Sequence, residues 1–140
     1  MGNSVSNKII TFTSFGFKYG LPKEANYVFD VRFIPNPYYV PELRRFSGRD
    51  KKIQDYLISF KEANELIENC ISFLDYIFPV FMISARSINI TIGCTGGRHR
   101  SVAFAEWLFS HYKEKYSRTN ENGNYELVLN HRDISIEGDE

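Results

Sequence analysis

The hydrophobic pattern of the chain alternates between two periods. Short β-rich apolar segments lie at 9–15, 27–33, 87–92 and 125–129. Apolar residues recur at three- and four-residue steps from Glu62 to Phe81 and again from Ser101 to Tyr116, which is the spacing of one buried helix face. Strands that alternate with helices predict a single layered α/β domain, in which helices flank a small and mainly parallel sheet.

Glycine and proline mark the segments that connect these elements. Residues 16–22 have a turn-forming composition, and residues 34–48 hold most of the prolines and are expected to form a long irregular loop. Loops of that length usually have a function. The segment 27–33 is mostly apolar and is expected to be buried on both faces of the sheet. Pro79 is expected to kink or end the first helix.

The chain is expected to form one domain. Residues 8–134 carry all of the periodic pattern, residues 1–7 predict a flexible N-terminus, and residues 135–140 predict a flexible acidic tail. Asn122-Gly123 marks a turn before the last strand. The pattern contains no internal repeat, no low-complexity stretch and no linker.

The composition of the chain argues against several classes of protein. The 140 residues are 43% hydrophobic and carry a net charge of zero, which permits a packed core and argues against a general nucleic-acid coat. No apolar run is long enough to predict a membrane span.

The two cysteines cannot form a disulfide scaffold, so a reducing cytoplasm is expected. No group of His and Cys residues has metal-ligand spacing, and we predict neither a metal nor another cofactor.

The segment between the third strand and the second helix has the composition of an anion-binding loop. Gly96 and Gly97 permit tight or left-handed backbone geometry, and the following helix places unpaired N–H groups and partial positive charge at its start. Arginine can bind phosphate through two hydrogen bonds. We therefore predict a phosphate site in this loop. Its ligand-binding residues are Thr95, Gly96, Gly97, His99, Arg100 and Ser101.

A cysteine-dependent phosphatase is the alternative interpretation of the same loop. Cys94 and Arg100 have the C-x5-R spacing, in which a thiolate attacks phosphorus and the arginine holds the phosphate oxygens. Gly93 stands where such enzymes usually have His. The general acid that this chemistry needs is left open among Asp30, Asp50, Asp55 and Asp133. No Walker P-loop motif is present, so ATP hydrolysis is not expected.

Longer motifs carry a family resemblance. They are SFGFKYGLP at 14–22, YVFDVRFIPNPY at 27–38, Leu43-Arg44, Ser47-Gly48, IGCTGGRHRSV at 92–102 and His131-Arg132. Together they resemble the C-terminal domain of the RNase adapter protein RapZ family. The resemblance implies a phosphofructokinase-subdomain-like fold, sensing of glucosamine-6-phosphate, contact with small regulatory RNA that is presented to an endoribonuclease, and homo-oligomers. The kinase-like P-loop domain that precedes this domain in the family is not in the sequence, so a partner protein or a separate P-loop subunit is expected.

The resemblance also assigns residues. It implies that Asn36, Arg44, Thr95, Gly96, His99 and Arg100 bind the ligand, and it places Lys18 at a matching basic position. Asp30 and Arg32 lie on one face of the second strand, where they form either a structural ion pair or part of the ligand site. Possible RNA contacts are Lys18, Arg98, His131 and Arg132. The acidic tail opposes RNA binding, because it repels the phosphate backbone.

Overall fold

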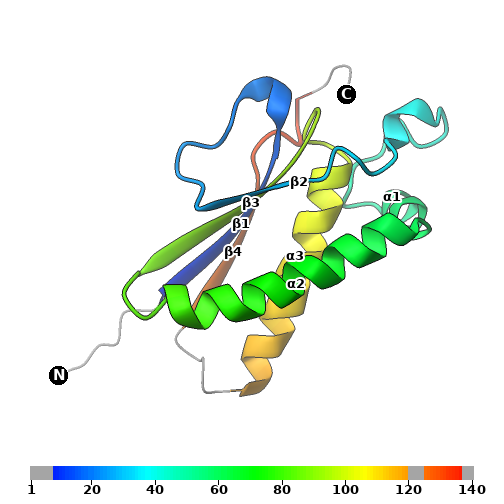
Figure 1. Ribbon diagram of the computed structural model, residues 1–140. Coiled ribbons are helices and arrows are strands. Elements are labelled where there is room, and N and C mark those ends of the chain that lie inside the picture. Colours follow the sequence, from blue (N-terminus) through cyan, green and yellow to red (C-terminus); the bar gives the residue numbers. More distant parts are fainter. Residues whose placement is uncertain (1–7, 120–124, 137–140) are drawn as a thin grey trace.

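The computed structural model describes residues 8–119 and 125–136 and confirms the α/β fold (Figure 1). The strands are β1 (Lys8–Gly16), β2 (Tyr27–Asp30), β3 (Ser87–Cys94) and β4 (Tyr125–His131). The helices are α1 (Lys51–Ile58), α2 (Lys61–Phe81) and α3 (Arg100–Thr119), with short 3-10 turns η1 (Phe17–Tyr19) and η2 (Pro37–Tyr39). The predictions for residues 1–7, for the turn at Asn122-Gly123 and for residues 137–140 lie outside the described residues.

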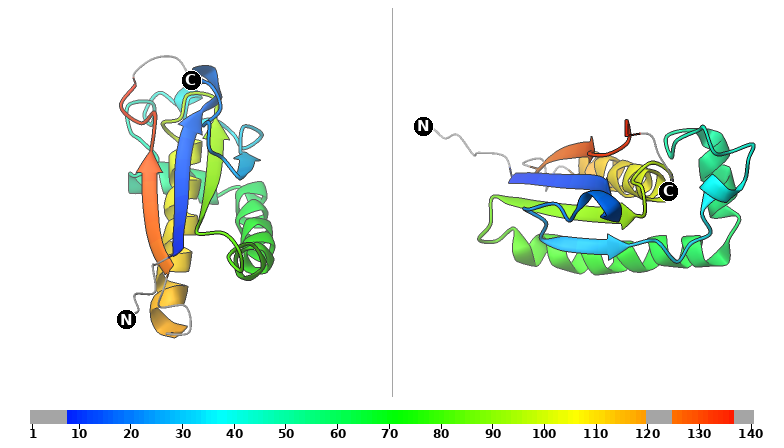
Figure 2. Two further views of the ribbon diagram at one scale, coloured as in Figure 1. Left: turned by 90° about the vertical axis from the view of Figure 1, so that its left-hand side faces the viewer. Right: turned by 90° about the horizontal axis from the view of Figure 1, so that it is seen from above.

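The four described strands form one parallel sheet in the order β2-β3-β1-β4. The chain moves in one direction across the sheet from β2 to β3 and from β3 to β4, but in the opposite direction from β1 to β2. Because parallel crossovers are right-handed, the β1–β2 connection belongs on the face opposite the helices. The strands stand in front of α3 in Figure 2 (left), and the connection 17–26 leaves the sheet away from the helices in Figure 1.

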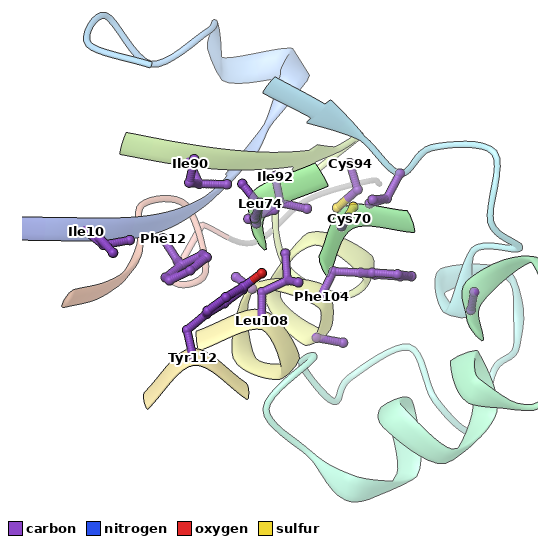
Figure 3. Packing of buried hydrophobic residues seen from close by; sticks show 14 of the residues in the cluster. Ile10, Phe12, Cys70, Leu74, Ile90, Ile92, Cys94, Phe104, Leu108 and Tyr112 are labelled. Carbon is purple, nitrogen blue, oxygen red and sulfur yellow. The ribbon is translucent and has the colours of Figure 1, made fainter. Parts of the chain in front are cut away.

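The hydrophobic core lies between the sheet and the helices (Figure 3). Alternate residues of β1 and β3 point into it, because successive side chains of a strand face opposite ways. Phe12 is fully buried and lies 6.3 Å from the Phe78 ring of α2 and 6.1 Å from the Tyr112 ring of α3. One aromatic cluster therefore joins the sheet to both long helices.

Two expectations about the second strand are wrong. β2 ends at Asp30, because the chain turns there and the N–H of Ile34 donates to the carbonyl of Val31 at 3.2 Å. β2 also lies at the edge of the sheet, and its residues are half-buried or exposed rather than buried on both faces. Val28 and Asp30 are exposed, whereas Tyr27 and Phe29 contact Phe73 of α2, so only one face of β2 is partly covered.

One helix was not predicted from the sequence, and one of the two options for Pro79 is excluded. α1 was not expected, because only Ile53 and Leu57 of its eight residues are buried and so short a stripe gives little periodicity. Pro79 lies inside α2, which continues to Phe81, so this proline does not end the helix. The long segment 34–48 is irregular apart from η2, as expected. None of the described helices is long and apolar enough to cross a membrane.

The hydroxyl of Tyr112 generates a prediction about stability. It lies 3.0 Å from the carbonyl oxygen of Ile71 and 2.9 Å from Oδ1 of Asp75, and burial is the main cause that raises the pKa of Tyr112. We expect Tyr112→Phe to lower the free energy of unfolding by about 1–3 kcal/mol, because buried acceptors lose a donor. Urea unfolding measures this. Tyr39→Phe is the control, since Tyr39 is exposed, and equal stabilities for the two variants would contradict the assignment.

Candidate functional site

The candidate site lies where the carboxyl ends of β1 and β3 meet. These strands are neighbours, but the connection after β1 and the connection after β3 leave the sheet on opposite faces. Ligands of open α/β sheets bind at such a topological switch point. The segment 95–99 between β3 and α3 therefore occupies the position where a ligand site is expected.

Backbone packs directly on backbone at this point. A Cβ atom on Gly16 would lie 2.5 Å from the carbonyl carbon of Gly96, and one on Gly97 would lie 2.5 Å from the nitrogen of Gly16. Gly97 also has a φ of +79°, which confirms the expected left-handed geometry in the loop. Both glycines are required here, because any side chain would push β1 away from the loop.

The carbonyl groups of the loop backbone accept hydrogen bonds, whereas its N–H groups do not donate in the same way. The carbonyl of Thr95 accepts from the N–H of Lys18 at 3.2 Å, and the carbonyl of Arg98 accepts from the N–H of Gly48 at 2.9 Å. Outside the helices and strands, no backbone hydrogen bond within the described ranges uses the N–H groups of residues 95–98 as donors. These donors precede the first turn of a 20-residue helix, a position that favours an anion. Convergence of the N–H groups on one anion stays a prediction.

Arg100 joins the loop to the segment that follows β2. Its side chain is almost fully buried, and Nη1 donates to the carbonyls of Arg32 (2.7 Å) and Ile34 (2.9 Å). Nη2 donates to Oγ1 of Thr95 at 3.3 Å, while Nε is buried without a hydrogen-bond partner. The guanidinium therefore holds the site together, and the direct phosphate contact expected of it stays a prediction.

His99 joins the loop to the proline-rich segment. It is fully buried, and Nε2 lies 3.1 Å from the carbonyl oxygen of Arg44, so Nε2 carries the proton. The Arg44 guanidinium donates through Nε to the carbonyl of Tyr38 and lies 4.7 Å from that ring centroid. Asn36 caps η2 by accepting from the N–H of Tyr38. The ligand residues expected in segment 36–44 are thus linked to the loop through Arg44.

Asp30 and Arg32 form the ion pair that the sequence left as one of two options. Their closest atoms are 2.7 Å apart, and the pair is about half exposed rather than buried. The hydrogen bonds from Arg32 lower the pKa of Asp30. The Arg32 guanidinium also lies 3.9 Å from the ring centroid of Phe17 in η1. The pair is structural in this arrangement, and a further role of Arg32 in ligand binding stays a prediction.

Cys94 does not face the loop. It is fully buried within the hydrophobic cluster, and its thiol donates to Oγ of Ser101 at 3.1 Å (Figure 3). Ser101 is fully buried as well. The phosphatase interpretation requires a thiolate exposed to phosphorus, and this geometry does not provide one. Strand parity could have indicated this, because Cys94 continues the alternation of Ile90 and Ile92 that faces the helices.

The comparison with known proteins places the chain in a family. Residues 8–135 match the RapZ C-terminal domain. The chain belongs to the RapZ C-terminal domain family. It is 52% identical over 113 residues to a nucleotide-binding protein of Dictyoglomus thermophilum, a match that covers 80% of this chain and 38% of that protein. A nucleotide-binding protein of Clostridium botulinum strain Loch Maree is 46% identical over 128 residues, covering 91% of this chain and 41% of its own length. The chain thus spans about two fifths of the length of these relatives.

Three of the basic residues expected to contact RNA have structural partners in this RapZ-type domain. Arg98 donates to the carbonyls of Ile134 and Arg45. His131 lies between Oγ of Ser14 (2.7 Å) and the carboxylate of Glu106 (2.8 Å). Arg132 pairs with Asp133 and donates to the carbonyl of Gly20. These side chains stabilise the turn after β4, and their contact with RNA stays a prediction.

Asp133 is the site residue that the sequence did not identify. It was considered only as a possible general acid, whereas its carboxylate is buried and accepts from the N–H of Gly16 at 2.8 Å. It thereby fixes the strand end on which the Gly96-Gly97 backbone packs. Its position directly after His131-Arg132 was the available signal. Across the described residues, no group of His, Cys, Asp and Glu side chains could hold a metal ion.

The buried thiols generate a prediction that tests the phosphatase interpretation. We expect neither cysteine of the native chain to react with iodoacetamide at pH 7, because both are buried, and burial raises the pKa of Cys70 to about 11. Mass spectrometry of the native and urea-unfolded chains measures this, and the unfolded chain should be labelled twice. The variant Cys70→Ala isolates Cys94. Rapid labelling of native Cys70→Ala would show that Cys94 is accessible and would restore the phosphatase interpretation.

Proposed function

We propose that this domain is a regulatory binding module for a small phosphorylated metabolite, a sugar phosphate such as glucosamine-6-phosphate, at the loop formed by residues 95–100. One observation carries the proposal. Gly97 adopts a left-handed conformation between β3 and the 20-residue helix α3, at the switch point of the sheet. Outside the helices and strands, the N–H groups of residues 95–98 donate to no backbone acceptor among the described residues. The start of α3, the N–H donors of the loop and the position of the loop at the switch point of the sheet all favour a phosphate group.

Three basic residues are joined to the loop through their backbones. The N–H of Lys18 donates to the carbonyl of Thr95, and the carbonyls of Arg32 and Arg44 accept from the side chains of Arg100 and His99. Such charges raise the local concentration of an anion and add charge-assisted hydrogen bonds. The buried Arg100 sets the geometry, and the outer cations are the groups expected to determine affinity.

Two features bear on the organic part of the ligand. Phe33 and Tyr39 are exposed at 61% and 71%, close in the sequence to Arg32 and to Arg44 respectively, and exposed aromatic rings can stack on the apolar face of a sugar. The relatives named nucleotide-binding proteins point to phosphate esters more generally. A sugar phosphate and a nucleotide share the phosphate chemistry of the loop, and the family resemblance favours the sugar phosphate.

Calorimetric titration tests this proposal. We expect glucosamine-6-phosphate to bind, glucosamine not to bind, and AMP and inorganic phosphate to bind more weakly. Arg44→Gln and Lys18→Gln should each weaken binding about tenfold, since one charge-assisted contact contributes about 1.5–3 kcal/mol. Lys61→Gln on α2 is the matched control, because it removes an exposed lysine far from the loop along the chain. Equal affinities for glucosamine and its phosphate would contradict the proposal, and tighter binding of AMP would change the ligand class.

An adapter role in RNA binding is the second candidate function. Aromatic rings and cations are interleaved beside the site: Lys18 lies 5.4 Å from the Tyr19 ring, and both Arg45 and Lys52 lie 4.8 Å from the Phe46 ring. Proteins bind single-stranded nucleic acid through such combinations of stacking and positive charge. A partner protein or separate P-loop subunit that reads the bound state belongs to the same proposal, as does a cytoplasmic location.

The salt dependence of RNA binding tests the adapter role. We expect weak binding. The logarithm of the association constant should fall linearly with the logarithm of salt concentration, because phosphate contacts release counterions. Lys18→Ala should reduce the slope by about one unit, whereas Lys61→Ala should leave it unchanged. Fluorescence anisotropy with a labelled single-stranded RNA measures both. Binding that is tight and insensitive to salt would require a different surface.

A further inference from the structure

A buried polar network lies on the helix side of the sheet, behind the phosphate loop of residues 95–100. Nδ1 of His131 lies 2.7 Å from Oγ of Ser14, and Nε2 of His131 lies 2.8 Å from the carboxylate of Glu106. Ser14 is fully buried, the His131 side chain is 8% exposed and the Glu106 side chain is 26% exposed. The network joins the end of β1, the end of β4 and the second turn of α3.

Two members of the network stand where the core pattern calls for an apolar residue. Phe12 precedes Ser14 on the same face of β1 and is fully buried, and Leu129 precedes His131 on the same face of β4 and packs against the core. An apolar side chain at either position would continue the core without the cost of burying a polar group. Polar groups that interrupt a core in this way are typical of a functional site.

The hydrogen bonds of the network fix the direction of each side chain. The ionised carboxylate of Glu106 only accepts, so Nε2 of His131 carries a proton and donates to it. With the ring neutral, Nδ1 of His131 then accepts from the hydroxyl of Ser14. Each member is therefore held in a single orientation by its neighbour.

The end of β1 is held at three successive points. The first is the hydrogen bond between Ser14 and His131. The carbonyl of Ser14 also accepts from the N–H of Arg132 at 3.0 Å. The N–H of Gly16 donates to the carboxylate of Asp133 at 2.8 Å. Since the phosphate loop packs on Gly16, these bonds determine where the loop lies against β1.

Glu106 connects this strand end to the other segments that hold the loop. It belongs to α3, which begins with the last loop residue, Arg100. Its carboxylate also lies 3.8 Å from Nε of Arg49. The neighbouring residue Gly48 donates its N–H to the carbonyl of Arg98 in the loop at 2.9 Å. One carboxylate therefore links β4, α3 and the segment beside the loop.

We propose that His131 and Glu106 are positioning residues of the phosphate loop, and that they act through Ser14 on the end of β1. The same three residue types form the catalytic triad of many hydrolases, but the Ser14 hydroxyl is fully buried and no substrate can reach it. The role is preorganisation, because a loop that is already held in its binding geometry loses little further freedom when the ligand binds. The inference rests on the proposed function, since ligand binding is the property that the positioning serves.

An apolar replacement of the whole network separates positioning from stability. The variant Ser14→Ala/His131→Leu/Glu106→Leu removes the polar groups together, so that no buried partner is left without a hydrogen bond. We expect its midpoint of thermal unfolding to equal or exceed that of the wild type. Its affinity for glucosamine-6-phosphate, measured by calorimetry, should fall about tenfold, because the loop is no longer preorganised. Glu126→Leu is the control, since Glu126 is exposed on the opposite face of β4.

A conservative variant tests the hydrogen bond between Glu106 and His131. Glu106→Gln keeps an acceptor for the Nε2 proton of His131 and should bind within about threefold of the wild type, whereas Glu106→Leu should bind about tenfold more weakly. The 15N spectrum of the His131 ring should show the proton on Nε2 in the wild type and in Glu106→Gln. Should the triple variant fail to fold, this pair of variants decides the question.

A measurement without ligand keeps the inference separable from the proposed function. Hydrogen exchange of the Gly16 amide should be about tenfold faster in the triple variant and in Glu106→Leu, because its bond to Asp133 opens more often. A wild-type chain that does not bind glucosamine-6-phosphate would contradict the proposed function, and the exchange of Gly16 would still decide the role of the network. Wild-type affinity and wild-type exchange in the triple variant would overturn the inference, as would equal losses in Glu106→Gln and Glu106→Leu.

Discussion

The contact between Gly16 and the Gly96-Gly97 turn is the constraint on which the site depends. It brings backbone against backbone where β1 ends and the loop after β3 begins, and it exists because Gly16 and Gly97 carry no Cβ atom. Asp133 holds the Gly16 N–H in this position. The left-handed turn at Gly97 follows from this contact, and with it the placement of the loop N–H groups before α3.

Cations near the site divide into two groups with different physical roles. Arg98 and Arg100 donate hydrogen bonds to backbone carbonyls, and these bonds fix the orientation of both side chains inside the domain. Lys18, Arg32 and Arg44 are exposed to solvent, and Arg32 is paired there with Asp30. A basic motif in a sequence does not separate these roles, because arginine is equally suited to capping carbonyls and to binding an anion.

The sequence predicted the parts of the fold that long apolar patterns determine. β1, β3, α2 and α3 carry strong periodicity and were located correctly, and the glycine pair located the loop. Edge strand β2 and helix α1 depend on tertiary contacts that leave little pattern. For the site, strand parity could have indicated the orientation of Cys94, although it was not used. The partners of Arg98 and Asp133 could not be predicted, because they come from segments far away in the sequence.

The hydrogen bond between Gly16 and Asp133 joins residues 117 positions apart. All strand pairs of the described sheet are likewise parallel and distant in the sequence, so no local hairpin can form early. A ribosome-bound chain that has not yet released β4 cannot complete the loop, even when every residue from 94 to 100 has been made. Closure of the loop against β1 therefore waits until β4 and Asp133 have been made, and folding of this domain is expected to be slow for its size.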